Sequence, residues 1–201
     1  EIINMKIKVC GITREEDIVS LLNSNIDYFG FNFIEESPRY VEQKWAIEMY
    51  HKYNLGEKFV ALFRSDRADI LNNIITYSPE STLQIYGDLK TDHFLHKLLI
   101  PVSVTTLKQN AYKDLLNPNK HKYLVDNMIN NLGWTGKKVD LNSIDKNLFP
   151  TIMIAGGIGI DDINNLQNLN FWGVDINSKI ELSPGIKNQD MIKILGDFIE
   201  K

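Results

Sequence analysis

The sequence contains a single cysteine, Cys10, so it cannot form an internal disulfide and carries no signature of an oxidising compartment. It has no run of 18 apolar residues, and its first residues lack the cationic-then-apolar order of a signal peptide. The net charge of -4 provides no positive field that would attract phosphate backbones. These absences lead us to expect a cytoplasmic protein without a membrane or nucleic-acid partner.

The sequence also has no recognisable linker between domains. No segment rich in proline, glycine or serine divides the 201 residues, and no internal repeat or low-complexity stretch is visible. Hydrophobic residues make up 43% and charged residues 24%, which is ordinary for a globular protein. We therefore expect one domain over residues 1–201, with residues 1–4 as a short extension that is either native or left from cloning.

Strand-like and helix-like segments alternate along the chain. The expected strands cover residues 5–10, 28–34, 58–63, 82–87, 99–104, 122–126, 150–157 and 171–177. The expected helices cover residues 14–25, 41–53, 68–78, 91–98, 107–116, 141–147, 160–169 and 188–201. Eight strand–helix pairs indicate an α/β fold with a parallel sheet, and eight strands can close a ring. We predict a single (β/α)8 TIM barrel rather than an open doubly wound sheet.

Active sites of such barrels lie where the strands end. Cys10 ends the first strand and Asp126 the sixth, so a thiol and a carboxyl could transfer protons across the barrel mouth. Each also has a structural reading, because a buried cysteine is often a small apolar residue and an aspartate often caps a turn. Lys8 shares a strand face with Cys10, where its charge would favour the thiolate. Alternatively, Lys8 only pairs with an acid such as Asp175.

Two loops indicate a phosphate site. Gly156 and Gly157 follow the seventh strand and offer backbone N–H groups to an anion, although glycine pairs also occur in ordinary turns. Residues 177–179 follow the eighth strand and supply Asn177, Ser178 and Lys179. Loops in these two places commonly bind phosphate in this fold.

Arg39 stands after the second strand and directly behind a proline that stiffens the approach. A guanidinium there could hold a carboxylate in bidentate fashion. The alternative is a surface arginine that pairs with Glu35 or Glu36. The residues themselves do not decide between the two readings.

Taken in order, these strand ends resemble the phosphoribosylanthranilate isomerase family of tryptophan biosynthesis. The motifs that carry the resemblance are KVCGIT at 8–13, GFNFIEESPRYV at 30–41, LQIYG at 83–87, YLVD at 123–126, AGGI at 155–158 and GVDINSKIELSPGIKN at 173–188. The resemblance implies an Amadori rearrangement of N-(5-phosphoribosyl)anthranilate to 1-(2-carboxyphenylamino)-1-deoxyribulose 5-phosphate. It also implies that neither a cofactor nor a metal takes part. We expect a monomer or a homodimer.

The resemblance also implies roles for the strand-end residues. Asp126 would be the general acid that opens the ribose ring, and Cys10 the general base that removes the proton from C2′. Arg39 would hold the anthranilate carboxylate. The 5′-phosphate would be held by Gly156, Gly157, Ser178 and Lys179.

Several positions depart from the family pattern. Tyr86 replaces a histidine, Trp134 replaces a glycine of a flexible loop, and Asn177 and Lys179 replace a serine and a glycine. If that glycine normally has a positive φ, Lys179 would be strained; alternatively, it would add a cation near the phosphate. These departures leave, as the alternative, a non-catalytic relic of this barrel family that binds a phosphorylated ligand or a partner. A third possibility is a related barrel isomerase of histidine synthesis. That family typically uses paired aspartates, so a cysteine at the end of the first strand disfavours this possibility.

Overall fold

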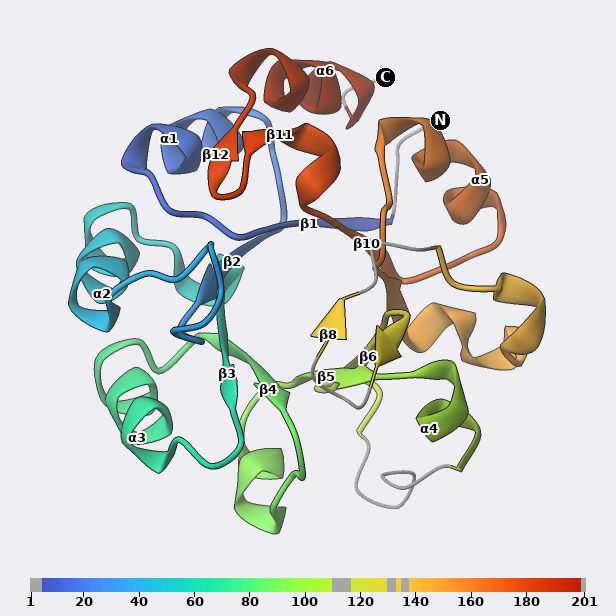
Figure 1. The fold of residues 1–201 in the computed structure, drawn as a ribbon, viewed down its shortest axis with the longest axis horizontal. Helices are drawn as coiled ribbons and strands as arrows, with labels where there is room; N and C mark the ends of the chain where they lie inside the picture. The colour runs from blue at the N-terminus through green and yellow to red at the C-terminus, as the bar shows by residue number, and fades with distance from the viewer. Residues whose placement is uncertain (1–4, 110–116, 130–132, 135–137, 200–201) are drawn as a thin grey trace.

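Eight parallel strands form a sheet that curves around a central axis (Figure 1). The computed structural model describes residues 5–109, 117–129, 133–134 and 138–199. The strands, in spatial order, are β4 (Thr82–Tyr86), β3 (Phe59–Arg64), β2 (Tyr28–Asn32), β1 (Lys6–Cys10), β10 (Gly173–Ile176), β9 (Ile152–Ile154), β6 (Lys122–Val125) and β5 (Leu99–Val102). A bridge between Leu83 and Leu98 joins the two edges, so the ring is nearly closed and the predicted barrel is confirmed.

Helices surround the ring of strands (Figure 1). The α-helices are α1 (Glu15–Asn23), α2 (Gln43–Lys52), α3 (Ala68–Tyr77), α4 (Val104–Gln109), α5 (Ile163–Asn168) and α6 (Gln189–Ile199). Short 3₁₀ turns lie at η1 (Gly56–Lys58), η2 (Thr91–Leu95), η3 (Leu141–Ser143), η4 (Lys146–Thr151), η5 (Ile160–Asp162) and η6 (Ser178–Ile180). Within the described ranges, no helix is long and apolar enough to cross a membrane.

Two expected helices are replaced by 3₁₀ turns. The prediction at 91–98 is only the turn η2, and the one at 141–147 is divided between η3 and η4. The side chains of Asp140 and Asp145 accept hydrogen bonds from backbone N–H groups two residues further on, which favours turns over a continuous helix. Pro150 lies inside η4 and has no N–H to donate. Most of the helix expected at 107–116 lies outside the described residues.

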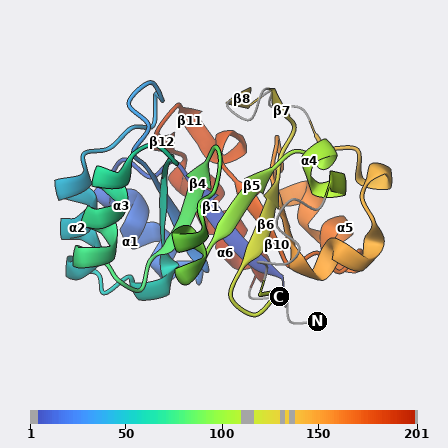
Figure 2. The ribbon, with the colours of Figure 1, turned by 90° about the horizontal axis from the view of Figure 1, so that it is seen from below.

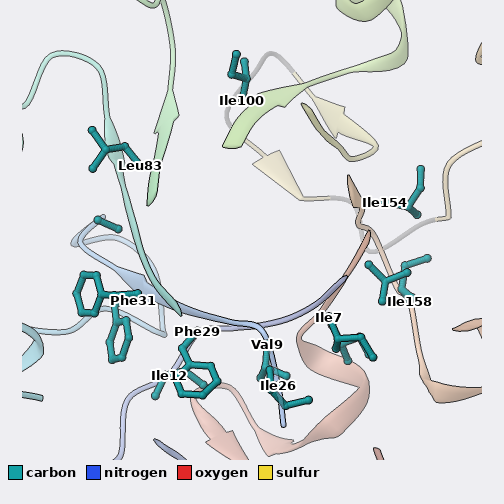
Figure 3. Packing of buried hydrophobic residues seen from close by; sticks show 14 of the residues in the cluster. Ile7, Val9, Ile12, Ile26, Phe29, Phe31, Leu83, Ile100, Ile154 and Ile158 are labelled. Atoms are coloured by element: carbon teal, nitrogen blue, oxygen red, sulfur yellow. The ribbon is translucent and has the colours of Figure 1, made fainter. Parts of the chain in front are cut away.

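Alternation along the strands divides the side chains into two layers. Ile7, Val9, Phe29 and Phe31 point away from the barrel axis toward the helices (Figure 3), where they belong to one large buried apolar cluster. The intervening residues face the interior of the ring, so Lys8 and Cys10 of β1 point inward. The outer layer stabilises the fold through burial of apolar surface, and it leaves the inner layer free to carry polar groups.

Two short antiparallel hairpins lie at one end of the barrel (Figure 2). They are β7 (Met128–Ile129) with β8 (Gly133–Trp134), and β11 (Glu181–Ser183) with β12 (Ile186–Lys187). Neither hairpin was predicted from the sequence. The second turns at Pro184 and Gly185, where Gly185 has a φ of 82° that suits glycine. This end is where the eight strands have their carboxyl ends.

Candidate active site

A cavity of about 310 Å³ opens at the carboxyl ends of the strands. Six of the seven predicted site residues line it, namely Cys10, Arg39, Asp126, Gly156, Gly157 and Ser178. Asn32, Ser37, Leu62, Tyr86, Leu124, Ala155, Ile158, Asp175 and Asn177 complete the wall. Strands far apart in sequence thus bring a thiol, a carboxyl, a guanidinium and a glycine pair to one space.

Lys179 is the predicted site residue that does not line the cavity. Its side chain is exposed and lies against the loop at Gly159, where a Cβ would meet Lys179 Cβ at 3.7 Å. The strain considered for this position is absent, because the non-glycine residues with positive φ are Asn25, Asn54 and Asn170. Lys179 therefore lies beside the Gly156–Gly159 loop and outside the cavity wall.

Cys10 lies directly above a buried ion pair. Lys8 is fully buried, and its Nζ lies 2.9 Å from Oδ1 of Asp175 on the neighbouring strand β10. Burial alone would lower the pKa of Lys8, but Asp175 and the Cys10 thiol raise it above its usual value, so the ammonium stays charged. Burial raises the pKa of Cys10, and the Lys8 cation opposes this rise. The predicted pairing of Lys8 with Asp175 is confirmed, whereas the Lys8 charge reduces the rise in the Cys10 pKa without bringing it below its usual value.

Asp126 follows β6 and is 5% exposed. Burial raises the pKa of its carboxyl to about 6, while a hydrogen bond from the Asn127 backbone N–H, 2.6 Å from Oδ1, opposes the rise. A carboxyl with such a pKa can hold a proton near neutral pH and donate it. Asp126 thus combines a place in the cavity wall with a pKa not far below neutrality.

Arg39 is held by Glu181, an acid distant in sequence that was not among its predicted partners. Its Nε and Nη2 donate to the Glu181 carboxylate, with Nη2 2.6 Å from Oε2. The alternative pairing with Glu35 or Glu36 is wrong, because those residues pair with Arg67 and Arg64. Glu181 occupies one edge of the guanidinium, and the edge formed by Nη1 and Nη2 remains for a second carboxylate.

Glu181 is itself fixed by a second cation. Nζ of Lys187, which is fully buried, donates to Glu181 Oε1 at 2.7 Å and to Asn177 Oδ1 at 2.9 Å. Burial alone would raise the pKa of Glu181, but Arg39 and Lys187 bring it below its usual value. The β11–β12 hairpin therefore anchors Arg39 and Asn177 together at the edge of the cavity.

The loop after β2 sets the approach of Arg39. The Asn32 side chain donates to Ser37 Oγ at 3.0 Å, and Ser37 Oγ accepts from the Arg39 backbone N–H at 3.2 Å. Gly11 lies beneath the guanidinium stem, with a φ of 74°. A Cβ at this position would stand 2.4 Å from Arg39 Cδ, so the close approach requires glycine.

Gly156 and Gly157 have consecutive positive φ values of 88° and 67°. Side chains rarely adopt this backbone conformation, and without a Cβ the two peptide groups stay accessible from the cavity. Such backbone is suited to bind an anion through N–H groups. Ser178, which also lines the cavity, supplies a hydroxyl from the neighbouring loop.

Tyr86 occupies the position of the family's histidine. Its ring is buried in the cavity wall, and its hydroxyl accepts a hydrogen bond from Gln84 Nε2 at 2.6 Å. For Trp134, the structure gives only its place in β8, and the neighbouring residues 130–132 and 135–137 lie outside the described part. The described residues include no group of three or more histidine, cysteine or acidic side chains that could hold a metal.

A family model described as N-(5′-phosphoribosyl)anthranilate isomerase matches residues 7–197. The chain belongs to this family. An isomerase of the same name from a Nitratiruptor species is 28% identical over 199 residues, which cover 98% of either chain. The motif resemblance is thereby confirmed, and with it the assignment as an isomerase of tryptophan biosynthesis.

Solved isomerase structures share the fold. A monomeric form of the dimeric Thermotoga maritima isomerase has a TM-score of 0.77 at 20% identity, with 98% of each chain covered. An isomerase in complex with reduced 1-(o-carboxyphenylamino)-1-deoxyribulose 5-phosphate has a TM-score of 0.74 at 20% identity, again with 98% of each chain covered. At this identity the two structures support the isomerase barrel as the fold.

Proposed function

We propose that this isomerase converts N-(5-phosphoribosyl)anthranilate to 1-(2-carboxyphenylamino)-1-deoxyribulose 5-phosphate, with Asp126 as general acid and Cys10 as general base. The observation that carries the proposal is one cavity lined by a protonatable carboxyl, a thiol above a buried cation, a guanidinium edge and two glycines with positive φ. This set matches a substrate with a carboxylate at one end, a phosphate at the other and an exchangeable proton between them.

The reaction is a sequence of balanced proton transfers. The Asp126 carboxyl gives its proton to the ribose ring oxygen, the C1′–O bond breaks, and the nitrogen lone pair forms an iminium with C1′. The Cys10 thiolate then removes the C2′ proton, which yields an enolamine. Tautomerisation of the enolamine gives the ketone at C2′, so substrate and product are isomers and no redox partner is needed.

Binding and chemistry use different groups in this proposal. The Nη1–Nη2 edge of Arg39 holds the anthranilate carboxylate, and the N–H groups at Gly156 and Gly157 hold the phosphate with Ser178. Lys179, which stands behind the Gly156–Gly159 loop, adds a positive charge near the phosphate rather than a direct contact. The enzyme acts without a cofactor or metal as a cytoplasmic monomer or homodimer.

The pH profile should carry the signature of the two proton-transfer groups. The active form needs Asp126 protonated and Cys10 ionised, yet the carboxyl has a pKa of about 6 and burial raises the thiol pKa above its usual value. Below about pH 6 the thiolate fraction grows tenfold per unit, so kcat/KM should rise with slope 1 and then level off. Above about pH 6 the loss of protonated Asp126 cancels the gain in thiolate. A profile of kcat/KM from about pH 4.5 to about pH 8.5 tests this, and a steady fall from about pH 5 upward would contradict it.

Arg39→Lys should raise KM roughly ten- to a hundredfold with kcat changed little. Lysine keeps the charge but cannot donate to Glu181 and to a substrate carboxylate through two planar edges. Steady-state kinetics measure the effect, with Arg67→Lys, a half-buried arginine outside the cavity, as the matched control. An unchanged KM would mean that the anthranilate carboxylate binds elsewhere.

The decisive experiment is loss of the fluorescence of N-(5-phosphoribosyl)anthranilate after addition of the enzyme. Turnover by the wild type supports the proposal. No turnover by a folded wild-type protein that still binds the product would favour a relic that only binds a phosphorylated ligand.

A further inference from the structure

A second cavity, of about 280 Å³, lies at the other end of the barrel. Its inward-facing residues Lys6, Tyr28, Thr82 and Lys122 are the first residues of β1, β2, β4 and β6, so it opens at the amino ends of the strands. It shares no lining residue with the first cavity. Active sites of this fold lie at the opposite, carboxyl end of the strands, and the proposed isomerisation uses no residue of the amino end.

The cavity has an excess of positive charge. Of the four lysines that line it, Lys6 is paired with Asp27 at 2.7 Å and Lys97 with Glu57 at 2.8 Å. Lys120 and Lys122 donate to backbone carbonyls and have no acidic partner among the described residues. Burial lowers the pKa of Lys122, and the Lys97 cation adds to this. An anion in the cavity would relieve both costs.

Thr82 provides an independent sign of a ligand. Its side chain is 4% exposed, and its hydroxyl oxygen has no hydrogen-bond partner. Thr82 shares the inward face of β4 with Gln84 and Tyr86, and it lines the cavity. An unmade hydrogen bond at a buried hydroxyl is unfavourable, so the position is suited to donate to an acceptor within the cavity.

The remaining wall favours an aromatic body. The rings of Tyr28 and Trp172 lie 5.7 Å apart at 43°. Lys122 Nζ lies 5.6 Å from the Trp172 ring centroid, so cation and ring face the same space. Val60 and Leu99 give an apolar floor. A volume of about 280 Å³ is at the small end of ligand sites and suits a molecule with a single ring.

We propose that the amino-end cavity binds a small aromatic carboxylate. The ring packs against Trp172 and the apolar floor, and the carboxylate accepts hydrogen bonds from Lys122 Nζ and the Thr82 hydroxyl. Binding here involves no group of the proposed isomerisation, so the two proposals stand or fall separately.

The test is a titration of the ¹⁵N-labelled isomerase with sodium benzoate, followed by amide and indole chemical shifts. Benzoate should shift Thr82, Leu99 and the Trp172 indole, which is assigned with Trp172→Phe. Cyclohexanecarboxylate and inorganic phosphate serve as matched probes that lack the aromatic ring. Shifts confined to Gly156, Gly157 and Arg39 would mean binding at the carboxyl end and would overturn the proposal. Equal affinity for phosphate would overturn the aromatic assignment.

Variants separate a binding role from a structural one. Thr82→Val should weaken benzoate binding about tenfold while the melting temperature of the free protein is unchanged or higher, because an unpartnered hydroxyl is removed. Lys122→Met should weaken it at least as much, and Lys44→Met, on the exposed face of α2, should have no effect. All three should retain isomerase activity. Unchanged benzoate affinity in both Thr82→Val and Lys122→Met would overturn the proposal.

Discussion

Replacement of Cys10 by alanine is expected to lower kcat about 10²–10⁴-fold, the usual contribution of a positioned general base. KM should change little, because the groups proposed to bind the carboxylate and the phosphate lie on other strands. The thiol stands over a lysine that is fully buried, and water cannot easily take its place as a base in so enclosed a position. Stopped-flow measurement of substrate fluorescence gives kcat and KM for the variant.

The fold should tolerate this change. Alanine is smaller than cysteine, and the Cys10 side chain packs against Gly30, where an added Cβ would lie 2.8 Å from Sγ. Circular dichroism and thermal unfolding serve as controls, and Asp126→Ala should be impaired to a similar degree. If both variants turned over substrate at the wild-type rate, the assignment of the two proton-transfer groups would be wrong.

Lys8→Met is expected to destabilise the protein by about 3–5 kcal/mol, the usual effect of removing one partner of a buried ion pair. The Lys8 side chain is 0% exposed and that of Asp175 is 9% exposed, so the remaining carboxylate would be left with little water. Urea unfolding near neutral pH measures the free energy of unfolding. The double variant Lys8→Met/Asp175→Leu should recover most of the loss, since it removes both charges.

The same variant reports on the thiol. Without the Lys8 cation, the pKa of Cys10 should rise further, and kcat should fall with the thiolate fraction. Because Cys10 is the only cysteine, the pH dependence of iodoacetamide alkylation gives its pKa without interference. An unchanged thiol pKa in a folded Lys8→Met protein would limit Lys8 to a structural role.

The barrel could be predicted because its signal is local and repeated. Apolar strands such as residues 59–64 and amphipathic segments such as residues 68–77 alternate throughout the chain, and each is recognisable within a short window. The helix predictions for residues 91–98 and 141–147 were wrong, because turn-forming hydrogen bonds compete there with a continuous helix. In the second, the side chains of Asp140 and Asp145 accept hydrogen bonds from nearby backbone N–H groups, and these turns outweigh helix periodicity.

The site was predictable where it depends on strand ends, as for Cys10 and Asp126. The site was less predictable where contacts between residues distant in sequence set its geometry. Arg39 and its partner Glu181 are 142 residues apart, and the sequence offered nearer acids. The Pro-Gly pair at 184–185 could have indicated a hairpin after the last strand. The local sequence does not, however, predict that Lys187 lies fully buried against Glu181.

The barrel has a seam. β4 and β5 are joined by the Leu83–Leu98 bridge and a backbone hydrogen bond from Leu83 N to Lys97 O, whereas β3 and β4 pair along five residues. A ring whose shortest joint is a single bridge can part there while its longer ladders stay intact. In hydrogen exchange, deuterium should therefore enter the sheet first beside Leu83, through a local opening whose free energy is much lower than that of global unfolding.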